Sequence, residues 1–203
     1  MSVPSPTTAL DVSPLAPFWR PGRRGADVAA PGITIAEPRY AYAQLIARRG
    51  TGTRLVEGIR STLGLALPEP CRATRSRDVR ALDIGPGNWL IAAPRHADAE
   101  LQRMLRSAAG DAGSVISQSH GKVTLAISGP ATRDCLAKGC RIDLHPRVFL
   151  PGHVAVTPIG PVNAIVAALE PAGSFELIVP SSVAAAFLEW LDTSAAEFGV
   201  ALA

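Results

Sequence analysis

An internal repeat constrains the fold of this chain more than any other feature of its sequence. Residues 89–95 read Trp-Leu-Ile-Ala-Ala-Pro-Arg and residues 175–181 read Phe-Glu-Leu-Ile-Val-Pro-Ser, and a predicted helix follows each. Upstream in each half, a predicted strand and helix precede a second pair of corresponding segments, at 63–68 and 138–143. Each half therefore predicts the order strand, helix, two strands, helix and closing strand, which is a split βαβ unit present twice.

Alternating apolar residues predict the strands, and apolar residues spaced by three or four predict the helices. The predicted strands are 40–48, 73–83, 88–93, 114–119, 122–128, 153–159, 162–169 and 174–179. The predicted helices are 53–63, 98–109, 130–138 and 182–198. Helices on one side of mostly antiparallel strands make an α+β fold, here built from duplicated ferredoxin-like units. We expect a single domain over residues 31–203, with its two repeats at about 40–119 and 121–200.

The first residues differ from the rest, because seven of the 18 prolines precede residue 40. Proline fixes φ and lacks an N–H donor, so neither a helix nor a central strand is predicted there. We expect residues 1–30 to form an extended arm that lies on a partner surface, with a disordered leader as the alternative. The candidate partner contacts in this arm are Leu15, Phe18, Trp19, Arg20, Arg23 and Arg24.

The charge balance gives little support for nucleic-acid binding. The chain has 20 Lys and Arg against 17 Asp and Glu, a net charge of +3. Its basic clusters at 20–24 and 72–80 lack the interleaved aromatic residues of a single-strand binding surface. No apolar run reaches the roughly 18 residues of a membrane-spanning helix, and an odd number of cysteines, three, favours a reducing compartment. We therefore expect a cytoplasmic protein that binds neither nucleic acid nor a membrane.

Sequence motifs for catalysis or metal binding do not combine into a site. The Gly-Pro-Gly-Asn segment at 85–88 precedes a predicted strand, which favours a hairpin turn over a phosphate-binding loop. Ser119 and His120 are neighbours near a strand, where side chains alternate between faces, so they do not form a nucleophile–base pair. Asp78 lies among arginines and is predicted to accept salt bridges. None of the four histidines has metal-ligand spacing to another His or Cys.

A set of short segments, in order, carries a family resemblance. These segments lie at 13–16, 84–90, 119–120, 127–130, 136–144, 149–152, 189–191 and 195–199. Together they resemble the gamma subunit of heterotetrameric sarcosine oxidase, over about residues 13 to 200. The resemblance implies a fold like the folate-binding domain of the glycine-cleavage aminomethyltransferases (T-protein).

The resemblance also implies a function. It implies a non-catalytic subunit of a complex that oxidatively demethylates sarcosine to glycine, forming hydrogen peroxide and either formaldehyde or 5,10-methylenetetrahydrofolate. The implied partners are the alpha, beta and delta subunits, with FAD, FMN and NAD on the larger subunits and zinc on the smallest. No cofactor, metal or catalytic residue is implied on this chain.

Two other functions remain as alternatives. One is a stand-alone tetrahydrofolate-binding or aminomethyltransferase-like protein, in which Asp78 or Glu176 would hold the pterin. The other is a folate-dependent iron–sulphur assembly factor, whose family shares the Lys-Gly-Cys step at 138–140. We rank it last because the Tyr and Gly-Gln-Glu residues of that family do not follow the step.

Overall fold

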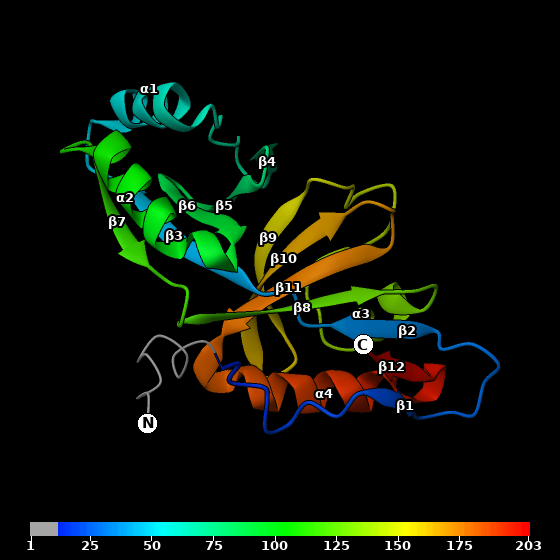
Figure 1. The fold of residues 1–203 in the computed structure, drawn as a ribbon. Helices are drawn as coiled ribbons and strands as arrows, with labels where there is room; N and C mark the ends of the chain where they lie inside the picture. The colour runs from blue at the N-terminus through cyan, green and yellow to red at the C-terminus, as the bar shows by residue number, and fades with distance from the viewer. Residues whose placement is uncertain (1–11) are drawn as a thin grey trace, which may run out of the picture.

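The computed structural model describes residues 12–203, which form two sheets that pack against each other (Figure 1). The first sheet has five antiparallel strands in the order β4-β5-β6-β3-β7. Its strands are β3 (Tyr40–Ala47), β4 (Ala73–Ser76), β5 (Val79–Gly85), β6 (Asn88–Pro94) and β7 (Gly113–Ser117). Two helices cover one of its faces, α1 (Gly52–Leu63) and α2 (Asp98–Ala109).

The second sheet has seven strands in the order β1-β12-β2-β8-β11-β10-β9. Its neighbouring strands are antiparallel except β12 and β2, which are parallel. The strands are β1 (Gly22–Arg24), β2 (Ile33–Ala36), β8 (Lys122–Ser128), β9 (Val154–Ile159), β10 (Val162–Leu169), β11 (Ser174–Pro180) and β12 (Val200–Leu202). The helices α3 (Thr132–Ala137) and α4 (Ala184–Ala195) pack on its outer face.

Three clusters of buried apolar side chains fill the spaces between the helices and the sheets and between the two sheets. The cluster between α1, α2 and the first sheet contains Leu55 and Leu105, both fully buried. The cluster between α3, α4 and the second sheet contains Phe175 and Phe187, also fully buried. A smaller cluster joins the two sheets and includes Tyr42 from the first. The layers therefore run helices, sheet, sheet, helices, and apolar burial stabilises each boundary.

The same order of elements occurs twice along the chain. From β3 the order is strand, α1, three strands, α2 and strand, and from β8 it is strand, α3, three strands, α4 and strand. The sheet orders correspond as well, since β4-β5-β6-β3 in the first sheet matches β9-β10-β11-β8 in the second. The halves differ at one end, where β7 lies directly beside β3 but β2 lies between β8 and β12.

The strand β2 shows that the prediction of no central strand before residue 40 was wrong. Ile33 and Ile35 are both fully buried, and β2 pairs with β12 on one side and β8 on the other. Pro31 and Pro38 lie outside the strand, so they remove none of its hydrogen-bond donors. The prolines therefore flank this strand and do not interrupt it.

Two other predicted elements are shorter than expected. The predicted strand 73–83 is a hairpin of β4 and β5, with a turn at Arg77 that has a left-handed φ of 53°. The predicted helix 182–198 is α4 with a 3-10 turn on each side. The predicted hairpin at 85–88 is confirmed, because Gly85 pairs with Asn88. Among residues 12–203, no helix is long and apolar enough to cross a bilayer.

Candidate functional site

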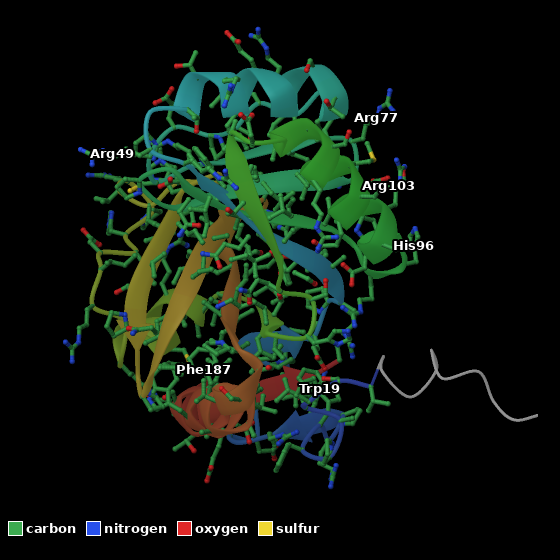
Figure 2. The ribbon with its side chains drawn as sticks, turned by 90° about the vertical axis from the view of Figure 1, so that its left-hand side faces the viewer. Trp19, Arg49, Arg77, His96, Arg103 and Phe187 are labelled. Carbon is green, nitrogen blue, oxygen red and sulfur yellow. The ribbon has the colours of Figure 1, made fainter. Side chains whose placement is uncertain are left out.

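The N-terminal segment, residues 12–30, folds back onto the second sheet and α4. The Leu15 side chain is fully buried in the core beneath that sheet, and Trp19 packs against the same core. A tight turn holds this position, because the Leu15 N–H donates to Ser13 Oγ at 2.9 Å and the Trp19 N–H to the Leu15 carbonyl at 2.8 Å. Figure 2 shows Trp19 at the same end of the molecule as Phe187 of α4. The predicted contact of Leu15 with a partner is therefore corrected, since a fully buried side chain has no surface to offer.

The other predicted contacts lie on the outer side of this segment. Phe18 is 55% exposed, which is unusual for a large aromatic side chain. Arg24 forms an ion pair of 3.0 Å with Asp192 of α4. Arg20 and Arg23 donate to the carbonyl oxygens of Trp19 and Ala29. A groove of about 460 Å³ between the segment and α4 is lined by Pro17, Phe18, Arg20, Arg24, Ala185, Ala186, Leu188, Glu189 and Asp192.

A buried ion pair connects the two sheets. Arg80 of β5 lies 2.5 Å from the Glu176 carboxylate of β11, and their side chains are only 15% and 3% exposed. The Tyr40 hydroxyl of β3 donates to the other carboxylate oxygen at 2.8 Å. The Arg80 guanidinium also stacks over the Tyr40 ring, 4.5 Å from its centroid. Both oxygens of Glu176 are therefore engaged by groups of the first sheet.

This arrangement shifts the pKa values of its members. Burial first, and then the charge of Glu176, raises the pKa of Tyr40 to about 12. Burial lowers the pKa of Arg80, but the charge and hydrogen bond of Glu176 raise it by more, so Arg80 stays charged. Burial likewise raises the pKa of Tyr42. A charged pair with a neutral phenol beside it suits a structural clamp better than a proton-transfer site.

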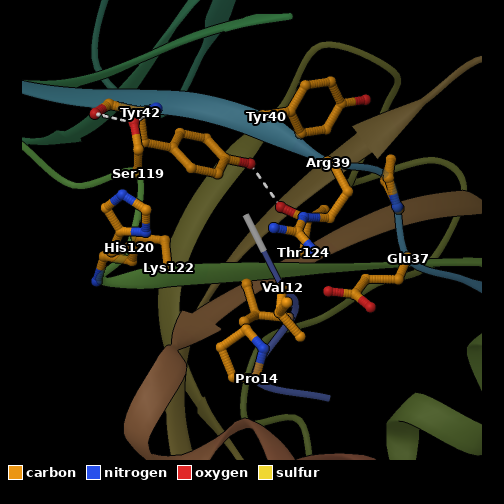
Figure 3. Close-up of a pocket in the computed structure, with 12 residues that line it drawn as sticks. Val12, Pro14, Glu37, Arg39, Tyr40, Tyr42, Ser119, His120, Lys122 and Thr124 are labelled. Carbon is orange, nitrogen blue, oxygen red and sulfur yellow. Dashed lines mark hydrogen bonds between the residues drawn. The ribbon is translucent and has the colours of Figure 1, made fainter. Parts of the chain in front are cut away.

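A small central pocket lies beside this clamp, between the sheets and the start of the N-terminal segment (Figure 3). The Tyr42 and Thr124 hydroxyls meet at 2.5 Å at its inner end, and Ser119 Oγ accepts from the Tyr42 N–H at 2.9 Å (Figure 3). The pocket has a volume of about 50 Å³. Pockets for drug-sized ligands measure about 300 Å³ or more, so this one holds a few waters at most.

The structure separates the two acidic residues considered for pterin binding. Asp78 lies exposed in the turn between β4 and β5, whereas Glu176 is buried on β11 in the ion pair described above. Burial raises the pKa of the Cys135 thiol to about 11 and also raises that of Cys140. Within residues 12–203, no three His, Cys, Asp or Glu residues lie close enough to hold a metal ion.

Sequence reasoning missed the pairing of Arg80 with Glu176. In the sequence Arg80 lies two residues from Asp78, which makes Asp78 its nearest candidate partner and leaves Glu176 without one. The available signal was a lone Glu in an otherwise apolar strand, Phe-Glu-Leu-Ile-Val, because such a residue needs a buried partner. The partner itself comes from the other sheet and could not be read from spacing.

Comparisons with known proteins match this description. The chain matches the sarcosine oxidase gamma subunit family over residues 51–197. It is 32% identical over 106 residues to a sarcosine oxidase subunit gamma of Arthrobacter sp., and 35% identical over 107 residues to one of Corynebacterium sp. strain P-1. Each match covers 48% of this chain and 52% of the relative, so the chain spans about half the length of the curated relatives it matches.

Two solved structures have a similar fold. A chain of heterotetrameric sarcosine oxidase from Corynebacterium sp. U-96, in complex with pyrrole 2-carboxylate, matches with a TM-score of 0.78 and 25% identity, covering 93% of this chain and 96% of that one. Aminomethyltransferase T of the glycine cleavage system from Bartonella henselae matches with a TM-score of 0.60 and 14% identity, over 85% of this chain and 48% of that one, which shows a shared fold. The predicted α+β fold of the folate-binding-domain type is confirmed, and the chain belongs to the sarcosine oxidase gamma subunit family.

Proposed function

We propose that the chain is a non-catalytic gamma subunit of a heterotetrameric sarcosine oxidase complex. That complex demethylates sarcosine oxidatively to glycine and forms hydrogen peroxide, with formaldehyde or 5,10-methylenetetrahydrofolate as the one-carbon product. Family membership over residues 51–197 is the observation that carries the proposal. The match over 93% of the chain to a chain of a solved heterotetramer supports it further.

The central region supports a structural role over a catalytic one. Glu176 is engaged by Arg80 and Tyr40, and the adjacent pocket of about 50 Å³ is far smaller than a pterin needs. The two described thiols with raised pKa values, Cys135 and Cys140, are protonated at neutral pH and so are poor nucleophiles. These features favour a structural role for this chain in the complex over a catalytic one.

The proposal assigns the reactive groups to the partners. It places FAD, FMN and NAD on the larger subunits and zinc on the smallest, with alpha, beta and delta chains as the partners. On this chain we assign partner contacts to Phe18, Trp19 and the arginines Arg20, Arg23 and Arg24, which lie in the segment 12–30 that packs on the second sheet and α4. Residues 1–11 of the predicted arm lie outside the described residues. A cytoplasmic location belongs to the same proposal and is checked by fractionation.

Co-expression tests the proposal directly. The full chain is produced with the three other subunits, with an affinity tag on the largest. The mass of the eluted complex is then measured by native mass spectrometry. We expect a complex with one copy of each subunit that oxidises sarcosine. Recovery of an active enzyme from the other three subunits, with this chain left in the flow-through, overturns the proposal.

Calorimetry with tetrahydrofolate separates this role from the stand-alone folate-binding alternative. The purified chain is titrated with tetrahydrofolate, with the aminomethyltransferase T as the positive control. We expect no binding heat, because the acidic residue nearest the centre is already paired. Saturable binding of one equivalent contradicts the non-catalytic assignment.

A further inference from the structure

Three of the four outer edges of the two sheets are protected against pairing with another strand. The edge strand β1 carries Arg23 and Arg24, and β4 carries Arg75. The edge strand β9 contains Pro158, and single bridges cover its ends, from Arg72 to His153 and from Cys140 to Ile159. Charged residues, proline and covered ends are the usual means of preventing edge-to-edge association.

Among residues 12–203, nothing gives the fourth edge, β7, any of these protections. The strand Gly113–Ser117 reads Gly-Ser-Val-Ile-Ser, without a charge or a proline, and its register with β3 has no bulge. Ser114, Ile116 and Ser117 are exposed, and Ile116 is 45% exposed. An uncharged, regular edge with an exposed apolar side chain is a template for an added strand.

The register shows which backbone groups of β7 point outward. The Gln118 N–H donates to the Tyr42 carbonyl, and the Arg48 N–H donates to the Ala112 carbonyl, so residues 112 and 118 face β3. Backbone groups of successive strand residues point to alternate sides, which places those of 114 and 116 toward β3 and those of 113, 115 and 117 outward. In the part of the chain that the structure describes, these outward groups have no hydrogen-bond partner.

In the second half, the strand that closes the repeat is paired on its outer edge. In chain order β7 corresponds to β12, although β2 separates β12 from β8 while β7 lies directly beside β3. The outer edge of β12 carries β1, through the pairs Gly22–Leu202, Arg23–Ala201 and Arg24–Val200. An extended segment therefore pairs with the closing strand of the second half, and the N-terminal segment supplies it.

The charges near β7 indicate what kind of segment fits. Arg48 flanks the Gly113 end, and Arg49 follows it and projects into solvent (Figure 2). At the same end Asp111 is already paired with Arg54 at 3.0 Å, so it does not offset these charges. The Ser117 end of β7 and the residues that follow it, Gln118, Ser119 and His120, include no acidic side chain. A second copy of β7 in antiparallel pairing places that end beside Arg48 and Arg49 and so offers these charges no partner.

We propose that β7 is the docking edge for an extended segment of another subunit of the complex, with an apolar side chain beside Ile116 and acidic residues facing Arg48 and Arg49. The pairing uses the outward N–H and C=O groups of Gly113, Val115 and Ser117. This inference rests on the proposed role of the chain as a subunit, because the partner segment comes from the same complex.

A proline substitution tests the edge without disturbing β3. Ser117→Pro removes an outward N–H and places its ring on the outer side, which edge strands tolerate. The matched control is Val156→Pro, at an exposed position of the edge strand β9. Each full-length variant is co-expressed with the other subunits, and the amount that co-purifies with the tagged largest subunit is measured. We expect at least a tenfold loss with Ser117→Pro and less than a twofold change with Val156→Pro, with unchanged thermal midpoints of the isolated chains.

Hydrogen exchange identifies the occupant of the edge. Peptides covering residues 112–118 are followed by mass spectrometry in the isolated wild-type chain and in the complex. We expect exchange at least a hundredfold slower in the complex for the outward amides, and an equal rate in both states for a peptide covering residues 155–157 of β9.

The remaining outcomes overturn the inference in distinguishable ways. A wild-type complex that forms with unchanged exchange at 112–118 overturns the docking edge and leaves the proposed function standing. Failure of the wild-type chain to join any complex overturns both. Protection in the isolated chain that grows with concentration assigns the edge to a second copy. Protection that is independent of concentration and lost on deletion of residues 1–11 assigns it to the chain's own N-terminus.

Discussion

The two halves of the molecule have the same order of elements but different surroundings. The first half, β3 to β7, has a five-stranded sheet under α1 and α2. The second half, β8 to β12, gains β1 and β2 from residues that precede β3 and becomes the larger sheet, with α4 along its outer face (Figure 1). The same supersecondary unit therefore has its closing strand paired on the outer edge in one half and open in the other.

The cores of the halves also differ in how they are filled. In the first half the helices α1 and α2 approach closely, and Gly58 leaves no room for a Cβ against the Ala108 carbonyl. In the second half the aromatic rings of Phe149 and Phe175 stack at 6.3 Å, and those of Phe187 and Trp190 at 5.9 Å. The second half therefore gains its packing from large side chains, and the first from close backbone approach.

Removing Glu176 is expected to have the largest effect, because it breaks the charged connection between the halves. Glu176→Ala leaves Arg80 buried without its counter-charge, and we expect the free energy of unfolding to fall by about 4 kcal/mol. Urea denaturation of the isolated chain measures the change. The matched control replaces both partners, Arg80→Met with Glu176→Leu, and should stay within about 1 kcal/mol of wild type. A single substitution that costs less than the double one contradicts the clamp.

The next largest effect concerns the anchor of the N-terminal segment on the second half. Leu15→Ala removes a fully buried side chain, and we expect a loss of about 3 kcal/mol in the same denaturation experiment. Phe18→Ala, three residues away and 55% exposed, should change the unfolding free energy by less than about 0.5 kcal/mol. Phe18→Ala should instead weaken recovery of the complex. Equal stability losses for the two variants show that the segment is not docked as described.

A smaller effect is expected at the ion pair between this segment and α4. Asp192→Ala removes the partner of Arg24, and both side chains are about one-third exposed, at 29% and 32%. Water screens such a pair, so we expect a loss of less than about 1 kcal/mol. Repeating the measurement at high salt should abolish the difference between Asp192→Ala and wild type. A loss that persists at high salt points to packing and not to charge.

The smallest effect appears only at alkaline pH, at the contact between the halves. The fold raises the pKa of Tyr40 from 10.0 to about 12, because burial and Glu176 favour the neutral phenol. This contribution to stability is complete below pH 10 and is lost as pH rises through about 12. The chain has two tyrosines, Tyr40 and Tyr42, so tyrosinate absorbance of the folded chain follows both. Absorbance that develops at pH 10 contradicts the raised pKa values, and Tyr40→Phe should remove the component near pH 12.

Most of the fold could be predicted from the sequence, but few contacts of the candidate site could. Alternation placed β8 and β10 at their observed bounds, and the repeat of segments around 89–95 and 175–181 corresponds to β6 and β11. Local sequence patterns did not predict contacts between residues that lie far apart along the chain. The buried position of Leu15 depends on a core that includes residues over a hundred positions later, such as Phe175 and Phe187, and the Arg80–Glu176 pair joins two sheets. Neither contact leaves a periodic signal.

The open edge of the first half also could not be predicted from the sequence. The segment 113–117 reads as an ordinary strand, and only the sheet order shows that β7 lies at an edge while β12 is covered by β1. Exposure of Ile116 follows from that position and not from its residue type.

Amide exchange resolved by NMR in the isolated full-length chain tests the central difference between the halves most directly. We expect the amides of Gly113, Val115 and Ser117 to exchange at near the unprotected rate while those of Ser114 and Ile116 are protected. We expect Val200, Ala201 and Leu202 all to be protected, because β12 is paired on both sides. Uniform protection across β7, or alternating protection along β12, contradicts an open edge in the first half and a covered one in the second.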